Sequence, residues 1–355
     1  NYDYIVLEVN YQYGQKNGKV RKFYPGGRLE FEGKYINGKR IGRGIECANT
    51  NADGTTFVNL IGGDPDSDSS STTSSSAYKL VVESGKYSSI QGFNPRGNTA
   101  SYAGIVYLVL GNDIDRKNVQ NTNMSVYYRT TMNSGGGTNG STSNDRAWQI
   151  NVKSGNYGTA FFDANINSST ASTVEDCAYA GVYMGGYGTT ASNSTYDAAN
   201  RYMIVEGGII ANAIGGLKVY SGRLVETRMY VKGGEIYNIV GGAGVSTTYG
   251  DRIVQVTGGK IRYSISGGSN GVYADTSGYG NQNQTGKVES CNTLVYVGGN
   301  AIVGTAGITN SLYGVEAGCV LGAGNGNSTQ ANSGQVDTSK VIINDVAYIK
   351  NSVYG

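Results

Sequence analysis

The sequence predicts an all-β fold: a parallel β-helix (β-solenoid) with right-handed connections and an N-terminal β-hairpin cap. The composition is the first indication, with 56 Gly, 3 Pro, and 29 Tyr against 6 Phe and 1 Trp. Glycine-rich turns between β-branched and aromatic residues are typical of short strands. The second indication is a glycine-centred motif that returns along the chain at a near-constant step. Parallel connections are generally right-handed, which sets the expected hand.

Three copies of the motif are the clearest: MIVEGGIIANAIGG (203–216), MYVKGGEIYNIVGG (229–242) and VQVTGGKIRYSISGG (254–268). We call the first glycine of each pair the anchor, and the anchors are Gly207, Gly233 and Gly258. The steps between them are 26 and 25 residues (233 − 207 and 258 − 233). A single repeat cannot bury its own apolar face, so the step predicts a stack of repeats.

Apolar residues occupy fixed positions around each anchor, and alternation of side chains along a strand puts them on one face. The predicted inward columns are Met203, Met229 and Val254, then Val205, Val231 and Val256, then Ile210, Ile236 and Ile261. Weaker copies predict further inward residues, namely Leu80, Val82 and Tyr87; Tyr107, Val109 and Ile114; Ile150, Val152 and Tyr157; Val295, Val297 and Ile302; Val341, Ile343 and Tyr348; and Val58 and Leu60.

Polar insertions lengthen some repeats, at 129–146, 273–290 and 323–340. All three precede the incoming strand of a copy, so we expect them to protrude from one corner, either as a binding face or as tolerated loops. Outside the stack, Glu206 and Lys232 fall side by side in consecutive copies. They predict a modest ion pair on a solvated surface.

The N-terminal part, residues 1–56, differs from the repeat domain at 57–355. Residues 17–44 resemble the MORN repeat, a short β-hairpin unit, over about one and a half copies. The matching residues are Phe31, Glu32, Gly33, Tyr35, Asn37, Gly38, Lys39, Arg40, Gly42 and Gly44. MORN repeats often occur in membrane-proximal or scaffold proteins, and here the resemblance implies a hairpin that caps one end of the stack.

Residues 57–355 resemble the glycine-rich parallel β-helix surface proteins of bacteria, with their GG-x-I-x-x-I-x-GG repeats. This resemblance implies an extracellular or cell-surface location more than it implies an activity. The chain begins at Asn1 without a signal segment, as expected of a mature secreted protein or of a fragment of a longer one.

Catalytic signatures are weak in this sequence. The chain has no histidine, which removes Ser-His-Asp triads and the commonest general base. Asp113 and Asp115, beside Arg116 and Lys117, are the place to seek lyase or glycosidase chemistry, although a charged turn is the simpler interpretation. We therefore assign no catalytic residues.

No cofactor or metal site is assigned either. A weakly bound calcium ion is a possible ligand of segment 49–54, or of Asp64, Asp66 and Asp68. The four cysteines lack any CxxC spacing, which argues against zinc. They are Cys47, Cys177, Cys291 and Cys319, and the sequence does not pair them.

Net charge is only +2 and the basic residues are scattered outside the N-terminus, so nucleic acid is not an expected partner. No apolar run approaches the roughly 20 residues that span a bilayer. Tyrosines in polar stretches are the candidate binding-loop aromatics: Tyr187, Tyr249, Tyr273 and Tyr279, with Tyr196 in a similar setting.

Together these features predict an extracellular or cell-surface structural or adhesive protein without catalysis. Such a protein would self-associate into a fibre or coat, or bind a surface glycan or protein. The alternatives are a carbohydrate-active β-helix enzyme, either a polysaccharide lyase or a glycosidase, and a monomeric carbohydrate-binding module.

Overall fold

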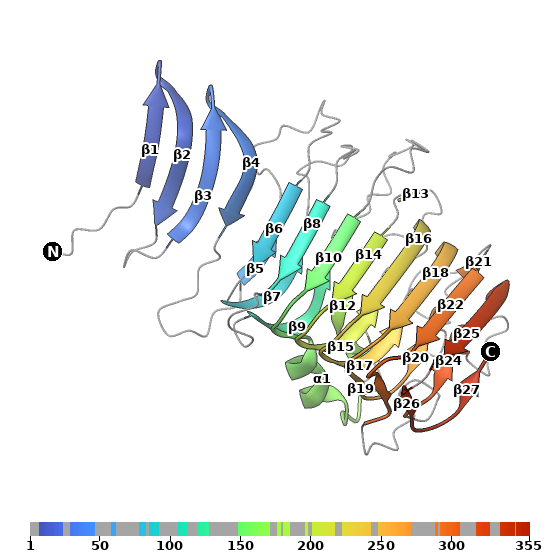
Figure 1. Ribbon diagram of the computed structural model, residues 1–355. Coiled ribbons are helices and arrows are strands. Elements are labelled where there is room, and N and C mark those ends of the chain that lie inside the picture. The colour runs from blue at the N-terminus through green and yellow to red at the C-terminus, as the bar shows by residue number, and fades with distance from the viewer. Residues whose placement is uncertain are drawn as a thin grey trace.

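The computed structural model describes much of the chain as three β-sheets and one helix (Figure 1). The described residues are 7–23, 29–46, 58–61, 78–82, 85–91, 106–111, 119–127, 148–170, 176–178, 180–184, 196–197, 201–216, 222–242, 248–270, 288–289, 292–305, 317–326, 334–344 and 346–355.

The N-terminal sheet has four antiparallel strands in chain order. They are β1 (Leu7–Gln12), β2 (Gln15–Phe23), β3 (Leu29–Ile36) and β4 (Lys39–Glu46). Its two hairpins turn at Tyr13–Gly14 and at Asn37–Gly38, and all four turn residues have positive φ. This is the geometry of tight type I′ turns, which match the twist of the flanking strands.

The two hairpins are copies of one sequence unit, 24 residues apart (35 − 11). Four identities recur at this step, in the pairs Glu8 and Glu32, Tyr11 and Tyr35, Gly14 and Gly38, and Gly18 and Gly42. The N-terminal part is therefore a duplicated hairpin that pairs with itself.

The second sheet has ten strands, and every pairing in it is parallel. Its strands are β6 (Tyr78–Val82), β8 (Val106–Leu110), β10 (Trp148–Val152), β13 (Tyr196–Asp197), β14 (Arg201–Val205), β16 (Gly222–Val231), β18 (Thr248–Val256), β21 (Val288–Glu289), β22 (Asn292–Val297) and β25 (Thr338–Ile343).

The third sheet has thirteen strands, also paired in parallel, and the helix α1 (Thr159–Asn165) lies against it. Its strands are β5 (Val58–Ile61), β7 (Gly85–Gln91), β9 (Val119–Tyr127), β11 (Asn156–Tyr157), β12 (Gly181–Tyr183), β15 (Ile209–Ile214), β17 (Glu235–Val240), β19 (Lys260–Ile261), β20 (Ile265–Ser266), β23 (Ile302–Val303), β24 (Val320–Leu321), β26 (Tyr348–Ile349) and β27 (Val353–Tyr354).

The anchor glycines carry the chain from the ten-stranded sheet to the thirteen-stranded sheet. A Cβ on Gly233 would lie 2.6 Å from the carbonyl oxygen of Glu206 in the preceding repeat, so successive turns touch backbone to backbone. The next residue, Gly234, has φ of 84°, in a region that side chains disfavour. The glycine pair is thus a requirement of stacking.

The predicted inward columns are confirmed for the three clearest copies. Met203 pairs with Met229 and Met229 with Val254, in register. All nine predicted residues are fully buried, and they belong to one core cluster that unites the two parallel sheets. Burial of this continuous apolar core is the main stabilising contribution.

The predicted closed β-helix with a hairpin cap is wrong. Among the described residues the strands form two open parallel sheets, running from β6 to β25 and from β5 to β26, in place of a closed tube. The N-terminal part is an antiparallel sheet of four strands rather than a single capping hairpin. The repeat step predicted parallel stacking, but it does not determine to how many sheets each repeat contributes strands.

The weaker copies are confirmed at eight predicted residues, which are buried in the core: Leu80, Val82, Tyr87, Ile150, Val152, Tyr157, Val295 and Val297. Two other placements were one residue out of register. In β8 the buried residues are Leu108 and Leu110, whereas Tyr107 and Val109 are half-buried on the outer side. A slip of one residue exchanges the two faces of a strand. Near Gly299 the buried residue is Val303, not Ile302, because Val303 pairs with Ile261.

The two ends of the repeat domain bring further corrections. Val58 pairs with Tyr87, which places segment 58–61 in the thirteen-stranded sheet and not with the strands before the anchors. At the other end Ile343 and Tyr348 are exposed, since they belong to the last described strands. Ile114 and most of the polar insertions lie outside the described residues.

Candidate binding face of the ten-stranded sheet

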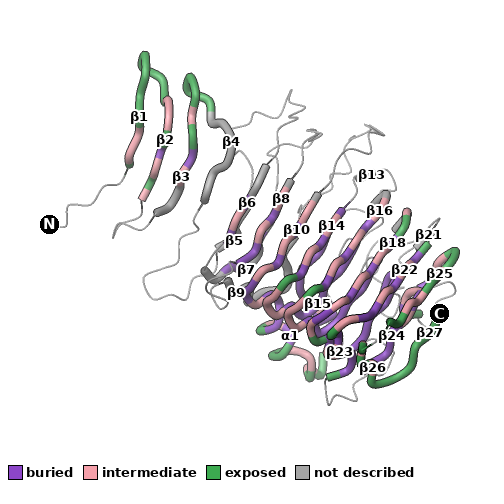
Figure 2. Tube along the Cα trace, viewed as in Figure 1, coloured by how far each residue is buried: buried purple, intermediate pink, exposed green. Residues whose placement is uncertain are grey.

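The outer surface of the ten-stranded sheet is the candidate functional site, and we call it the outer face. It is formed by the residues that alternate with the inward columns, so their side chains point away from the core. The described strands β14, β16, β18 and β22 show this alternation of buried and intermediate residues (Figure 2). Helix α1 lies on the other sheet (Figure 1).

Two columns of side chains cross the strands on the outer face. The first column lies between the inward columns that contain Met203 and Val205. Its members are Val81, Val109, Asn151, Ile204, Tyr230, Gln255, Tyr296 and Ile342. Its neighbour, the second column, contains Lys79, Tyr107, Gln149, Tyr202, Arg228, Ile253, Leu294 and Lys340. Apart from Lys79, whose side chain is not described, the members of the two columns are half-buried except for Lys340, which is exposed.

The two columns are rich in rings, aliphatic groups and amides. Their charged residues are Lys79, Arg228 and Lys340, and the Glu206 and Lys232 pair lies beside them. Arg228 forms an ion pair with Glu226 on the same strand. The hydrogen bond to Glu226, followed by one to Tyr230, raises the pKa of the Arg228 guanidinium above its ordinary value. The charge of Arg228 is therefore balanced within the face.

Tyr296 has the most closely defined position on the outer face. A Cβ on Gly298 would lie 2.8 Å from the Tyr296 hydroxyl and 3.0 Å from two ring carbons, so the ring lies over this glycine. Asn344 Nδ2 donates a hydrogen bond of 2.9 Å to the Tyr296 hydroxyl from the neighbouring strand end. The hydroxyl end of the ring therefore lies close to Gly298, and Tyr296 remains partly exposed.

A polar ladder borders the two columns near the start of the strands. Asn292 donates hydrogen bonds of 2.9 Å and 3.1 Å to Asp251 Oδ1 through its backbone nitrogen and its side-chain amide. Thr338 then donates to Asn292 Oδ1. These residues join three neighbouring strands and provide a hydrophilic rim to the face.

A second cluster lies beneath α1 and is a packing site. Tyr237 donates a hydrogen bond of 3.0 Å to Asp163 of the helix, and the Arg262 guanidinium lies 4.1 Å from the Tyr237 ring centre. Phe162 meets the Tyr237 ring edge-on with 5.1 Å between centroids. Burial raises the pKa of Tyr263 to about 12, so its hydroxyl stays protonated. Because these rings are covered, they dock the helix and offer no open surface.

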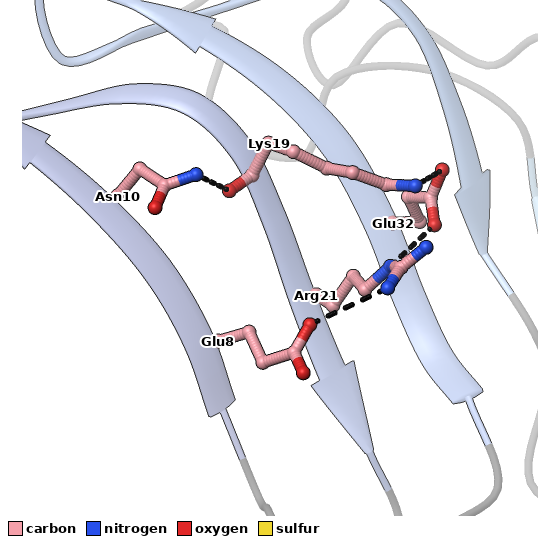
Figure 3. Close-up of polar contacts among 5 residues, drawn as sticks. All are labelled: Glu8, Asn10, Lys19, Arg21 and Glu32. Carbon is pink, nitrogen blue, oxygen red and sulfur yellow. Dashed lines mark hydrogen bonds and ion pairs between the residues drawn. The ribbon is translucent and has the colours of Figure 1, made fainter.

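The N-terminal sheet carries an exposed ion-pair network (Figure 3). Lys19 Nζ and Arg21 Nε each lie 2.8 Å from a carboxylate oxygen of Glu32, and Arg21 Nη1 lies 3.5 Å from Glu8 Oε2. Asn10 Nδ2 donates to the Lys19 carbonyl at 3.3 Å. The hydrogen bond from Lys19 is the main cause that lowers the pKa of Glu32. Exposed pairs of this kind contribute modestly to stability.

The tyrosines proposed from sequence fall mostly elsewhere. Tyr249 of β18 pairs with Arg223 of β16 and with Glu289 of β21. Tyr196 of β13 pairs with the same Arg223 from the other side. Tyr187, Tyr273 and Tyr279 lie outside the described residues, as do Asp113, Asp115, segment 49–54 and Asp64, Asp66 and Asp68. The structure therefore brings Tyr196 and Tyr249 into one column, two strands apart with Arg223 between them, while the remaining candidates lie outside the described residues.

Sequence reasoning missed the tyrosines of the two columns, although a signal was present. Tyr230 stands three residues before Gly233, and Tyr296 stands three residues before Gly299, the equivalent glycine of its copy. Each tyrosine lies between two residues that were correctly placed inward. Strand alternation requires such a position to face outward. Only the column next to the anchor was considered, and there the predicted pair of Glu206 and Lys232 is confirmed, with 4.0 Å between Oε1 and Nζ.

Two of the four cysteines are described, Cys177 and Cys319, and both are buried. Cys47 and Cys291 lie outside the described residues. The part of the chain that the structure describes contains no group of three potential metal-ligating side chains.

No helix within the described ranges combines the length and hydropathy needed to cross a bilayer. Comparison of the chain with protein-family models, with curated proteins and with solved structures gave no match. The interpretation of the outer face therefore depends on its own residues.

Proposed function

We propose that the chain is an extracellular or cell-surface structural protein that attaches non-covalently to a partner through the outer face. The observation that carries this proposal is the pair of uninterrupted columns of rings, aliphatic groups and amides across the ten-stranded sheet. Regular, weakly charged surfaces with tyrosine suit contact with a partner.

The remainder of the molecule supports a scaffold role. In-register parallel pairing and one apolar core fix the spacing of the outer columns, so the face is held rigid before any partner arrives. Preorganisation of this kind lowers the entropic cost of binding. The face presents groups for contact and hydrogen bonding, as expected of adhesion rather than catalysis.

Retention on solid supports tests the proposal. The protein would be passed over three supports: an insoluble polysaccharide, gelatin, and immobilised copies of the chain itself. We expect retention on at least one, and we expect the double variant Tyr230→Ala/Tyr296→Ala to lose it. Tyr11→Ala is the matched control, because Tyr11 is an exposed tyrosine of the N-terminal sheet. The proposal fails if no support retains the protein in a manner that depends on the outer face.

A second candidate function is end-to-end self-assembly, which the last described strands favour. Val346, Tyr348, Val353 and Tyr354 are exposed there, with 77%, 58%, 44% and 53% of their surface accessible. Among the described strands, β25 pairs only with β22, which leaves one edge open. Open edges with apolar side chains favour association between chains.

Sedimentation and electron microscopy test this second candidate. Self-assembly predicts a mass that rises with protein concentration and ordered fibres in images. The variant Val346→Lys should shift the protein toward monomers, because it places a charge in the contact. Monodisperse particles of the wild-type protein at all concentrations would exclude this route.

A further inference from the structure

We infer that the outer face binds an extended, uncharged polysaccharide that runs across the strands. This inference rests on the proposed function, because it names the ligand class of the same face. Four features of the face lead to it: its length, its charge, the order of its side chains and the position of Tyr296.

The length of the face suits a polymer. The first column crosses eight strands from β6 to β25, hence seven spacings. At about 4.8 Å between neighbouring strands, the column extends about 34 Å. A small ligand would use a fraction of it, whereas a linear chain laid across the strands meets every repeat.

The charge of the face argues for a neutral ligand. Arg228 is balanced by Glu226, and Lys79 and Lys340 stand at the two end strands of the second column. A strongly anionic polymer would need an array of cations, which the two columns as defined do not supply. Retaining a neutral ligand requires contact area and hydrogen bonds instead.

The order of side chains matches the two kinds of surface that a sugar ring presents. Pyranose rings have apolar faces of C–H groups and an edge of hydroxyls. In the first column Tyr230 and Tyr296 flank Gln255, one strand on each side. The two tyrosine positions are therefore about 9.6 Å apart, twice the strand spacing. Rings for stacking alternate with an amide that can donate and accept hydrogen bonds.

An apolar protein surface would be a poorer occupant of the face. It would cover the amide of Gln255 without offering it a partner, and an unsatisfied buried amide costs binding free energy. Asn151 differs, because its Oδ1 already accepts a hydrogen bond of 2.6 Å from Gln149 Nε2. Hydroxyl groups of a glycan satisfy the amide of Gln255. A second copy of the chain presents the same face and is treated as an outcome of the test.

Tyr296 provides the stacking platform in this arrangement. Its hydroxyl end lies close to Gly298 and accepts a hydrogen bond from Asn344, so a partly exposed ring is held in one position. Gly298 matters because any Cβ at this position meets the ring. The glycine is thus a positioning residue for Tyr296.

Affinity electrophoresis of the full chain tests the inference directly. Native gels would contain hydroxyethyl cellulose or galactomannan as neutral probes, and polygalacturonate as an anionic probe. We expect retardation by at least one neutral probe and weaker retardation by polygalacturonate. The double variant Tyr230→Ala/Tyr296→Ala should lower the affinity about tenfold or more, as loss of aromatic anchors does. Tyr11→Ala should leave it unchanged.

The variant Gly298→Ala separates ring position from ring presence. It keeps Tyr296 but displaces the ring, so we expect lower affinity with an unchanged circular dichroism spectrum. Wild-type affinity of this variant would contradict the role of Gly298. The inference is overturned if neither neutral probe retards the protein, if the double variant is retarded like the wild type, or if polygalacturonate retards it more strongly.

The outcomes also separate the inference from the proposed function. Retention on gelatin or on immobilised copies that depends on Tyr230 and Tyr296, without retention by neutral glycans, would overturn the polysaccharide and leave an adhesive face. Retention on none of these supports would overturn both.

Discussion

Asn212 of β15 pairs in register with Asn238 of β17, and both amides are buried. Ser264 continues this polar row by donating a hydrogen bond of 2.8 Å to Asn238 Oδ1. Asn212 Nδ2 donates to the carbonyl oxygens of Cys177 and Ala180 at 2.9 Å and 2.7 Å. One side chain thus ties the segment after α1 to the thirteen-stranded sheet.

Replacement of Asn212 by alanine should therefore destabilise the fold. The change removes the donor for two buried carbonyl groups, and buried groups left unsatisfied cost about 1–3 kcal/mol of unfolding free energy. Urea unfolding measures the loss. Asn10→Ala is the control, because Asn10 makes a similar bond to a backbone carbonyl but is exposed, and it should change stability by less than about 0.5 kcal/mol. Equal effects of the two variants would show that burial of the Asn212 amide is unimportant.

Two adjacent residues of β8 test the orientation of that strand. Leu108→Asp should prevent folding, because it places an uncompensated charge in the core at a residue with no accessible surface. Val109→Asp should cost only about 1 kcal/mol, since Val109 is half-buried on the outer face. Soluble yield and circular dichroism distinguish the two. Tolerance of Leu108→Asp together with misfolding of Val109→Asp would restore the register expected from sequence.

The ion pairs of Glu32 should make the N-terminal sheet less stable in acid. Its pKa is lowered from 4.5 in the folded protein, so the folded state binds its proton less readily than the unfolded state. Its stabilising contribution is present above about pH 4.5 and is lost as the pH falls through the lower folded pKa. The carboxyl carbon shift of Glu32 in NMR should titrate below the ordinary glutamate value.

The variants Lys19→Met and Glu32→Gln control this pH experiment. Lys19→Met removes the main cause of the shift and should move the Glu32 midpoint upward. Glu32→Gln should make the thermal midpoint less sensitive to pH between 6 and 3. An unshifted Glu32 titration in the wild-type protein would contradict the network of Figure 3.

Cys177 should be unreactive in the folded protein. Burial, with smaller contributions from Asp176 and Asp163, raises the pKa of the thiol to about 11, so little thiolate exists at pH 8. We expect iodoacetamide to modify Cys177 only after denaturation, as peptide mass spectrometry would report. Cys319 is also buried and should behave likewise. Rapid modification of Cys177 in the native state would show that the segment beneath α1 opens readily.

The repeat and its inward columns could be predicted because strand alternation and the anchor spacing fix them jointly, as Met203, Met229 and Val254 show. The register of β8 could not be predicted. Every residue of VYLVL is apolar, so the sequence does not indicate which face of the strand points inward. The shift at Val303 has a different origin: the turn after Gly299 contains one more residue than the turn after Gly258.

The outer face could have been predicted in part. The position of Tyr230 follows from alternation alone, but the contact between Tyr296 and Gly298 depends on a side-chain conformation that spacing does not reveal. The sequence also could not predict that the stack is open rather than a closed tube. The repeat step gives the number of residues per layer, but not the number of sheets that share them.

Among the described strands, each repeat pairs with the repeats on either side of it in both parallel sheets. Stability is then shared among local interfaces, and distant parts of the stack are connected only through the layers between them. Heat or a pulling force should therefore unfold the molecule one layer at a time, starting from an end. Removal of one whole layer should shorten the molecule by one strand spacing and leave the remaining layers stacked.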